Sequence, residues 1–216
     1  MEVEELTSVA QDYLKVIWSA TEWGDPPITT TGLARRFDTT SANVSVTLRR
    51  LEGQGLLSYQ PYRPAELTEL GQRLALAMVR RHRLLETFLA TELGYAWDEV
   101  HDEAERLEHA VSEELLARID HRLGFPLVDP HGDTIPRTDG TLAPRVVALS
   151  LSQALPGSYR VVRVSDADSV VLAKLAALGV VPGAEIDWYL DPPGIGVGGR
   201  FHELTSTILA AIRVAA

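Results

Sequence analysis

Apolar residues recur three or four positions apart over residues 6–22, 69–93 and 97–123. Side chains at that spacing share one face of an α-helix, so each stretch predicts an amphipathic helix. The predicted apolar faces carry Val9, Tyr13, Ile17 and Ala20 in the first helix, Leu74, Met78, Leu85 and Phe88 in the second, and Val100, Ala104, Leu107 and Val111 in the third.

Residues 28–68 lie between the first two helices and follow a different pattern. Residues 31–50 predict a short helix, a turn at "DTTS" and a second helix, because Thr and Ser in the turn can cap the second helix. Residues 56–68 then alternate through a Pro-containing turn, as the two strands of a wing would. The segment therefore predicts a winged helix-turn-helix.

The composition changes after Phe125. Residues 126–145 are rich in Pro, Gly and Asp, which is typical of a linker. Short β-like runs follow, around a helical pattern that begins at Ser169. These runs predict a small β-barrel at the end of the chain.

Composition limits the possible functions. The chain has 216 residues, 45% of them hydrophobic, and no cysteine, so any metal would be held by nitrogen and oxygen. No run of eighteen apolar residues occurs and the first residues are acidic, so we expect neither a membrane span nor a signal peptide. These features favour a cytoplasmic protein.

Charge is spread unevenly along the chain. The formal net charge of -10 disfavours indiscriminate nucleic-acid binding, because phosphate affinity comes from Lys and Arg. Residues 28–66, however, carry five arginines against three acids, a net of +2. Residues 86–114 carry ten acids against one arginine. DNA contacts are therefore expected in the first of these segments and cation binding in the second.

The predicted second helix of the helix-turn-helix begins with small polar residues that could reach base edges. Asn43 is the best candidate for reading an adenine, and the arginines suit phosphates. The alternative is a helical hairpin that serves only packing; the wing and the local positive charge favour DNA. The candidate DNA-binding residues are Thr40, Ser41, Asn43, Ser45, Arg49, Arg50 and Arg63.

The stretch "VHDEAERLEH", residues 100–109, places two histidines and four carboxylates within ten residues. On a continuous helix Glu105, Glu108 and His109 would converge and could hold one divalent ion, with His101 a turn away. His82 and Glu86 form a second pair four residues apart. A solvated acidic face is the simpler explanation for each piece alone. Two His-carboxylate pairs on neighbouring helices favour metal binding.

At these residues the sequence resembles the diphtheria-toxin-repressor family of metal-dependent transcriptional repressors. The stretches "RRHRLLETFL", "VHDEAERLEH" and "PHGDTIP" carry the resemblance, together with "LAALGVVPGAEI" and "GVGGRFHELTSTILAAIRV" near the C-terminus. The resemblance implies a mainly α fold with small β parts. Its expected domains are a winged helix-turn-helix (1–73), a helical metal-binding and dimerisation domain (74–125), a linker (126–147) and an SH3-like barrel of the FeoA type (148–216).

The resemblance also implies two metal sites, a homodimer and a palindromic double-stranded DNA operator. Iron-responsive members have Met and Cys where this chain has Asp12 and Glu105, and carboxylates there suit Mn²⁺. The implied primary site consists of Asp12, Glu105, Glu108 and His109. The implied ancillary site consists of His82, Glu86, His101 and a barrel residue, Asp168 or alternatively Asp166.

We therefore expect a manganese-activated repressor of metal-uptake genes and not an enzyme. Fe²⁺ is the alternative metal, and Zn²⁺, Co²⁺ or Cd²⁺ could act as surrogates. Without metal, repulsion among the acids is expected to leave the first helix poorly tied. The rival functions are a winged-helix regulator of a small organic effector and, less favoured, a binuclear metallohydrolase. The remaining histidines, His121, His131 and His202, are expected in surface or loop positions.

Overall fold

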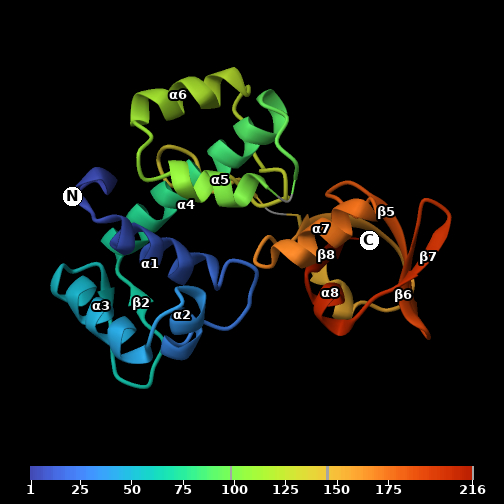
Figure 1. Cartoon of the computed structure of the whole chain (residues 1–216), viewed down its shortest axis with the longest axis horizontal. Coiled ribbons are helices and arrows are strands. Elements are labelled where there is room, and N and C mark those ends of the chain that lie inside the picture. The colour runs from blue at the N-terminus through green and yellow to red at the C-terminus, as the bar shows by residue number, and fades with distance from the viewer. Residues whose placement is uncertain (98, 145, 216) are drawn as a thin grey trace. The chain divides into compact units, whose positions relative to one another are not determined.

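A computed structural model describes residues 1–97, 99–144 and 146–215 of the chain (Figure 1). It contains two compact units. Unit 1 comprises residues 1–82, 108–110 and 136–141, and unit 2 comprises residues 83–107, 111–135 and 142–216. The long helix α4 begins in unit 1 and ends in unit 2.

Unit 1 contains the predicted winged helix-turn-helix. Its elements are the short 3-10 helix η1 (Val3–Glu5), the helices α1 (Ser8–Ser19), α2 (Thr30–Arg36) and α3 (Ser41–Gly53), the strands β1 (Leu57–Ser58) and β2 (Glu66–Leu67), and the start of α4 (Glu69–Glu92). Each of the first three α-helices begins after a threonine whose side chain accepts a backbone N–H, which satisfies one of the free donors of the first turn. These caps are Thr7, Thr29 and Thr40.

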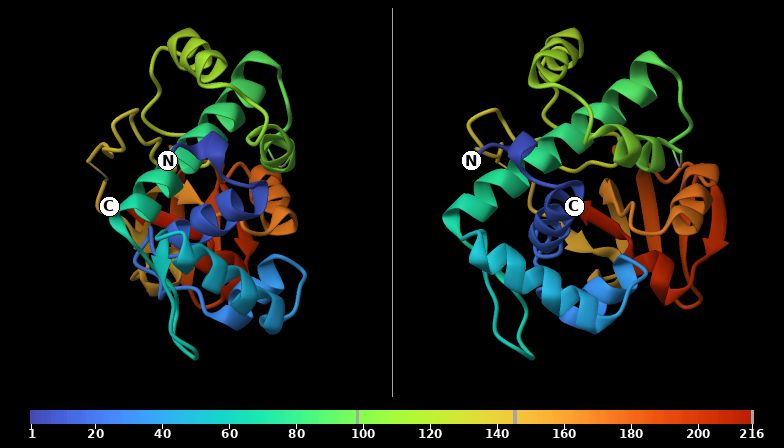
Figure 2. Two further views of the ribbon diagram at one scale, coloured as in Figure 1. Left: turned by 90° about the vertical axis from the view of Figure 1, so that its left-hand side faces the viewer. Right: turned by 60° about the vertical axis from the view of Figure 1, so that its left-hand side comes forward.

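The wing is a hairpin in which β1 pairs antiparallel with β2. Figure 2 shows it projecting beyond the helices of its unit. The core beneath it is formed by α1, α3 and α4, where Leu14, Leu48 and Met78 are all fully buried. Val9, expected on the apolar face of the first helix, is instead exposed, because Ala10 and Leu14 take the inward positions.

Unit 2 begins with the second half of α4 and continues into α5 (Val100–Leu107) and α6 (Glu113–Arg122). The prediction of one helix over residues 97–123 is wrong. The chain leaves α5 at Glu108, whose side chain is drawn fully inward, and Ser112 then caps a new helix by accepting from Leu115 N. Glu108 and His109 consequently lie in a turn between helices.

The middle of the predicted linker is buried. Residues 131–136 are all buried, and Val128 and Thr134 form an isolated β-bridge. Gly132 approaches β4 (Gly157–Val164) so closely that a Cβ would overlap the carbonyl oxygen of Val162, and its φ of +92° is itself costly for other residues. Residues 129–135 are therefore a packed part of unit 2 and not a free linker.

The rest of unit 2 is the small β-domain expected from the sequence. Its six-stranded antiparallel sheet has the order β3-β8-β4-β5-β6-β7, and its core includes Leu172, Ile195 and Trp188. Together with β4, its elements are β3 (Leu149–Ser150), η2 (Leu151–Gln153), α7 (Ser169–Ala177), β5 (Glu185–Leu190), β6 (Pro193–Val197), β7 (Arg200–Glu203), α8 (Ser206–Ala210) and β8 (Ile212–Ala215).

The predicted fold class, mainly α with a winged helix-turn-helix and a small C-terminal β-domain, is confirmed. Within the described residues, no helix is both long enough and apolar enough to cross a membrane.

Gly71 gives a test of the packing that supports the wing. A Cβ at this position on α4 would overlap the carbonyl oxygen of Leu56, just before β1, so Gly71→Ala should lower the free energy of unfolding by about 1–3 kcal/mol. Gly53→Ala, at the end of α3 with open space around the added Cβ, is the control and should be neutral or slightly stabilising. Chemical denaturation measures both. Equal stability of the two variants would contradict the packing.

Candidate metal centre and nucleic-acid interface

Within unit 1, α1 and the turn after α5 bring together two carboxylates and an imidazole. We name Asp12, Glu108 and His109 the α1 cluster. One ligand-type atom from each lies within 4.8 Å of the others. His109 Nε2 is 3.1 Å from Asp12 Oδ1 and 3.7 Å from Glu108 Oε1. Three of the four residues predicted for the primary site are therefore neighbours.

The ring of His109 is oriented by Gln11. The amide nitrogen of Gln11 donates to the carbonyl of Val3, which leaves the amide oxygen 2.7 Å from His109 Nδ1. An amide oxygen can only accept, so Nδ1 carries the proton and donates. Nε2 then faces the carboxylates, which is the orientation in which a metal-binding histidine is held by a second residue.

Glu108 is the fully buried member of the cluster, and two groups outside the cluster balance its charge. Lys15 Nζ donates to Oε1 at 2.6 Å, and His82 Nδ1 donates to Oε2 at 2.6 Å. Burial by itself would raise the pKa of Glu108, but His82 and Lys15 outweigh it and hold the pKa below its ordinary value. Glu108 is therefore an ionised carboxylate inside the protein.

The expectation that acid repulsion leaves the first helix poorly tied is wrong. Asp12 and Lys15, both on α1, pair with His109 and Glu108 respectively. Sequence spacing could not show this, because the acids were considered only against one another. Cations from α1 and α4 in fact reach them.

Glu105, the fourth residue predicted for the primary site, lies on α5. Its Oε1 is 3.4 Å from Nε2 of His101, on the preceding turn. Its role as a primary ligand stays a prediction from the resemblance.

A second group of acids and imidazoles lies in unit 2, around the fully buried carboxylate of Glu86 on α4. We name Glu86, His101, Asp129, His131 and Asp166 the Glu86 cluster. His101 Nδ1 lies 3.1 Å from Glu86 Oε1 and 3.4 Å from Asp166 Oδ2. The cluster thus joins α4, α5 and the loop after β4.

The other two residues predicted for the ancillary site are Asp168 and His82. Asp168 caps α7, where its Oδ1 accepts from Val170 N and Val171 N. Asp166, the alternative barrel residue, is the one beside His101. His82 lies one helical turn before Glu86 on α4 and, as described above, donates to Glu108.

Asp129 and His131 were missed by the sequence analysis, which predicted a linker there and a loop position for His131. In the structure His131 lies in a turn, but it is fully buried and not at the surface. His131 Nε2 is 3.3 Å from the carbonyl of Trp97, which can only accept, so Nε2 carries the proton. Nδ1 has no hydrogen-bond partner among the described residues and lies 3.9 Å from Glu86 Oε1. The alternation of Asp and His in "DPHGD" was the available signal.

Electrostatics in the Glu86 cluster favour an added cation. Burial raises the pKa of Asp129 well above its ordinary value, and the charges of Asp133 and Glu86 add to the effect. Burial by itself would lower the pKa of His101, but hydrogen bonds with Asp166, Glu105 and Glu86 raise it to about 12. A proton on His101 therefore already compensates part of the negative charge, and a divalent cation could compensate more.

Both clusters fit a divalent metal on their donor atoms. Each combines carboxylate oxygens with an imidazole whose other nitrogen donates to a carbonyl oxygen, of Gln11 for His109 and of Trp97 for His131. This second contact fixes the ring and is a regular feature of metal-binding histidines. Nitrogen and oxygen are the only donor types in these clusters, which consist of histidines and carboxylates.

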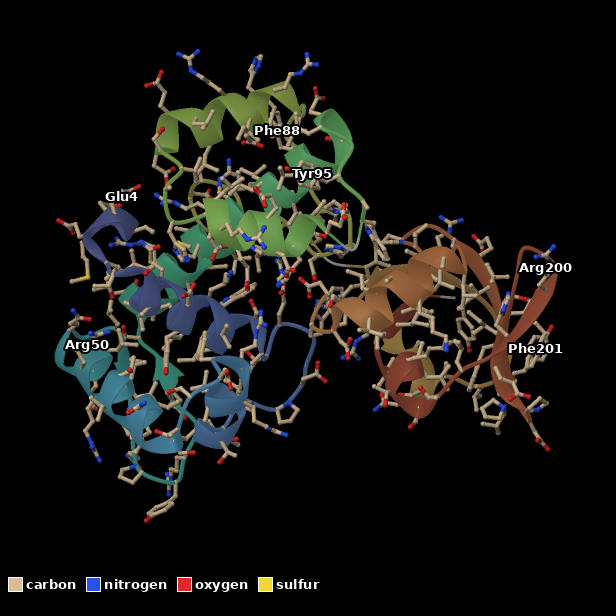
Figure 3. All side chains as sticks on the ribbon, viewed as in Figure 1. Glu4, Arg50, Phe88, Tyr95, Arg200 and Phe201 are labelled. Atoms are coloured by element: carbon tan, nitrogen blue, oxygen red, sulfur yellow. The ribbon has the colours of Figure 1, made fainter. Side chains whose placement is uncertain are left out.

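The exposed face of α3 carries the predicted DNA contacts. Asn43 is exposed at its first turn, and Arg49 and Arg50 are exposed near its end; Figure 3 labels Arg50 on this helix. Between them Val46 is 64% exposed, which the sequence analysis did not single out. An apolar side chain there could meet a thymine methyl group. Of the residues at its start, Ser41 is exposed and Thr40 serves as the N-cap.

Ser45 and the wing complete this surface. The hydroxyl of Ser45 lies 3.0 Å from that of Tyr59, so Ser45 joins α3 to the wing and is only half-exposed. At the wing tip Arg63 is exposed, as predicted, beside the fully exposed Tyr62, which the sequence analysis missed.

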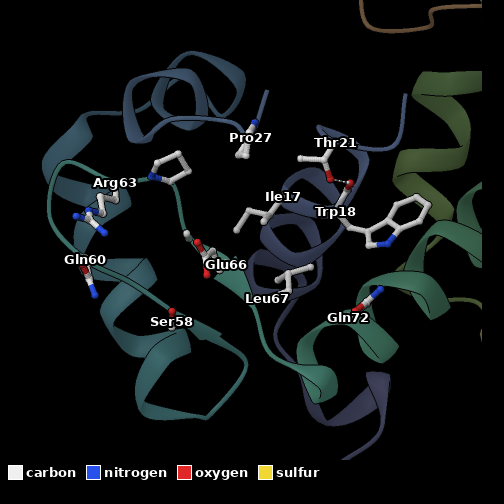
Figure 4. A pocket seen from close by; sticks show the side chains of 12 residues that line it. Ile17, Trp18, Thr21, Pro27, Ser58, Gln60, Arg63, Glu66, Leu67 and Gln72 are labelled. Atoms are coloured by element: carbon white, nitrogen blue, oxygen red, sulfur yellow. Dashed lines mark hydrogen bonds between the residues drawn. The ribbon is translucent and has the colours of Figure 1, made fainter. Parts of the chain in front are cut away.

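A pocket of about 630 Å³ opens between α1 and the wing (Figure 4). Ile17, Trp18 and Leu67 form apolar parts of its lining, and Gln60 and Arg63 form polar parts. Its lining contains none of the residues predicted as metal ligands.

Comparisons with known proteins agree with this arrangement. Residues 5–65 match the family model for the iron dependent repressor N-terminal DNA binding domain. Residues 68–137 match the model for the iron dependent repressor metal binding and dimerisation domain, and residues 149–216 match the FeoA domain. The chain belongs to the diphtheria-toxin-repressor family of metal-dependent transcriptional repressors.

Repressors of this family bind operator DNA through the N-terminal domain and dimerise through the metal-binding domain, and they are not enzymes. The iron-dependent repressor IdeR of Mycobacterium tuberculosis H37Rv is 33% identical over 89% of this chain and 88% of its own. The diphtheria toxin repressor of Corynebacterium glutamicum is 30% identical over 98% of each chain.

Solved structures of the family are also similar. A manganese-dependent transcriptional repressor in complex with manganese has a TM-score of 0.89 at 45% identity, covering 96% of this chain and 99% of its own. The manganese regulator SloR has a TM-score of 0.81 at 30% identity, covering 95% and 97%. The expected family, fold and general function are therefore confirmed.

The raised pKa of His101 predicts a pH dependence of stability in the metal-free repressor. Folding raises this pKa from 6.5 to about 12, so the stabilisation is fully present below pH 6.5 and is lost as the pH rises towards 12. Between pH 7 and 10 the free energy of unfolding of the wild type should fall relative to that of His101→Gln. Denaturant titration at each pH measures the difference. His121→Gln, at an exposed position, should run parallel to the wild type, and a parallel course for His101→Gln would contradict the assignment.

Two substitutions on α3 separate base reading from phosphate binding. Asn43→Ala should weaken operator binding by about 1–3 kcal/mol and relax base preference at one position of each half-site. Arg50→Ala should weaken specific and random DNA alike and reduce the salt dependence of binding. Binding assays on operator variants test both. An Asn43→Ala variant that behaves like Arg50→Ala would remove the role assigned to Asn43.

Proposed function

We propose that this repressor is activated by Mn²⁺ and controls genes of metal uptake in the cytoplasm. The observation that carries the proposal is the donor set of the α1 cluster, two carboxylates and one oriented imidazole on α1 and the turn after α5. Relatives are named for iron in some cases and for manganese in others, so the donor atoms of this chain have to decide between the metals.

Carboxylate oxygens favour Mn²⁺ over softer metals as an activator. Hard oxygen ligands suit Mn²⁺, which has little geometric preference, whereas sulfur ligands favour later transition metals. Asp12 supplies such an oxygen, and Glu105 is proposed to supply another. Raw affinity should still follow the general divalent order, so Zn²⁺ would bind at least as tightly. The choice between Mn²⁺ and Zn²⁺ as activator would then depend on the number of ligands that each ion binds, since Zn²⁺ prefers four.

Metal binding would strengthen the link between α1 and residues 108–110. An ion held by Asp12 of α1 and by Glu108 and His109 of the turn would bridge these two segments directly. The link would hold the DNA-reading helices of the dimer at the spacing of successive major grooves. A repressor that needs its metal to bind DNA silences its targets when the metal is abundant, which suits genes of metal uptake.

The Glu86 cluster is proposed as a second metal site. Its support is the buried carboxylate of Glu86, which belongs to two groups of possible ligands, one with His101 and Asp166 and one with Asp129 and His131. Because Asp166 follows β4, an ion there would tie the β-domain to α4 within unit 2. This site would therefore stabilise unit 2 of the repressor.

The primary assignment is tested by Glu108→Ala and His109→Ala. Either change should abolish Mn²⁺-dependent operator binding, a loss of at least about 100-fold, because each removes one ligand. Glu103→Ala, which removes an acid paired with Arg106 on α5, is the matched control and should respond to Mn²⁺ like the wild type.

The DNA-binding assay is run with and without Mn²⁺, beside circular dichroism to check folding. Folded variants that still respond fully to Mn²⁺ would refute the assignment of the α1 cluster. Metal-independent operator binding by the wild type would instead favour a regulator of a different effector.

A further inference from the structure

Lys15 is a buried cation at the edge of the α1 cluster. It lies three residues after Asp12 on α1 and is 7% exposed. Its Nζ is 2.6 Å from Glu108 Oε1 and 3.5 Å from His82 Nδ1. The chain has only two lysines, Lys15 and the exposed Lys174, so the other 18 of its 20 Lys and Arg positions are arginine. This buried position therefore carries the compact ammonium of lysine, although the chain has arginine at nearly all of its other Lys and Arg positions.

Lys15 donates a hydrogen bond to Glu108 Oε1, the oxygen through which the α1 cluster would bind a metal. Glu108 Oε1 accepts from Lys15 at 2.6 Å and is also the oxygen 3.7 Å from His109 Nε2. The other oxygen, Oε2, accepts from His82 at 2.6 Å. Both oxygens of Glu108 are thus already engaged by protein donors. An ion bound between Glu108 and His109 must share Oε1 with Lys15 or displace it.

Charge makes this competition unfavourable for the metal. The carboxylates of Asp12 and Glu108 together carry two negative charges, and the ammonium of Lys15 cancels one of them. A divalent ion in the cluster would also lie a few ångströms from a like charge, inside the protein where screening by water is weak. The same ammonium already ties α1 to the turn after α5.

We propose that Lys15 sets the concentration of Mn²⁺ at which the repressor is activated. Its ammonium holds the Glu108 carboxylate, and Mn²⁺ must compete with it for that group. The proposal rests on the proposed function in taking the α1 cluster as the Mn²⁺ site. Lys15 lowers the affinity of that site, so that the site fills only when the metal is abundant. In the absence of metal it stabilises the contact between α1 and Glu108.

The test compares Lys15→Met, Lys15→Gln and Lys15→Arg in the full-length protein. Mn²⁺ affinity is measured from the electron paramagnetic resonance of free Mn²⁺, and thermal unfolding is measured on the metal-free protein. Lys15→Met removes the charge and should bind Mn²⁺ at least about tenfold more tightly. It should also unfold at a lower temperature without metal, because it leaves buried Glu108 with only one of its two cationic partners.

Two further variants separate charge from packing. Lys15→Gln keeps a donor for Glu108 without the charge, so it should show the same gain in affinity and serves if Lys15→Met does not fold. Lys15→Arg keeps the charge and should bind Mn²⁺ no more tightly than the wild type. Lys174→Met, at an exposed position on α7, should change neither affinity nor unfolding temperature.

A purely structural Lys15 would give the opposite sign. If folded Lys15→Met and Lys15→Gln bind Mn²⁺ as weakly as the wild type or more weakly, the proposal is overturned. The His109→Ala variant distinguishes failure of the proposal for Lys15 from failure of the proposed function. If His109→Ala binds Mn²⁺ as well as the wild type, the α1 cluster is not the metal site, whatever the lysine variants show.

Discussion

The buried carboxylate of Glu108 is the interaction on which unit 1 depends. It lies in the turn after α5, receives hydrogen bonds from Lys15 of α1 and His82 of α4, and stands beside His109. A charge fully removed from water is tolerated only when it is paired and hydrogen-bonded, so three separate segments are drawn to this one group. The helix that would otherwise continue through residues 108–112 breaks there. Under the proposed function, metal sensing and folding would share this one residue, and a bound metal would act on α1 through the contact that Glu108 already makes with Lys15.

Unit 2 is organised around buried charge in a similar way. Residues 129–133 carry two acids and a histidine into the interior, where Arg83 Nε lies 3.5 Å from Asp129 and Arg163 Nε donates to Asp133 at 2.7 Å. Val164 N also donates to the carbonyl of His131. These contacts fix the segment against both α4 and β4. A cluster built in this way can bind an ion without first ordering its ligands, which lowers the cost of binding.

Local sequence patterns predicted the helices well and the site only in part. The periodicity of residues 69–93 and the caps of the helix-turn-helix depend on neighbours along the chain, and both were confirmed. Glu108 and His109 were predicted as ligands from their spacing within residues 100–109, whereas Asp12 was assigned through the family resemblance, because no spacing rule relates residues so far apart. One partner of Glu108, Lys15, is 93 residues away in the sequence. Burial of His131 likewise depends on residues distant in the sequence, since Val164 of β4 donates to its carbonyl. The composition of residues 126–145 predicted a linker, because Pro and Gly indicate the local backbone conformation and not what packs against it.

The central claim is that Mn²⁺ activates the repressor from the α1 cluster, and anomalous X-ray scattering at the manganese edge tests it most directly. Crystals of the Mn²⁺-loaded dimer on its operator would locate each ion without reference to the protein coordinates. The account predicts an anomalous peak within bonding distance of Asp12, Glu108 and His109. Operator-bound protein with manganese only elsewhere, and with Glu108 held by Lys15 and His82 alone, would contradict it.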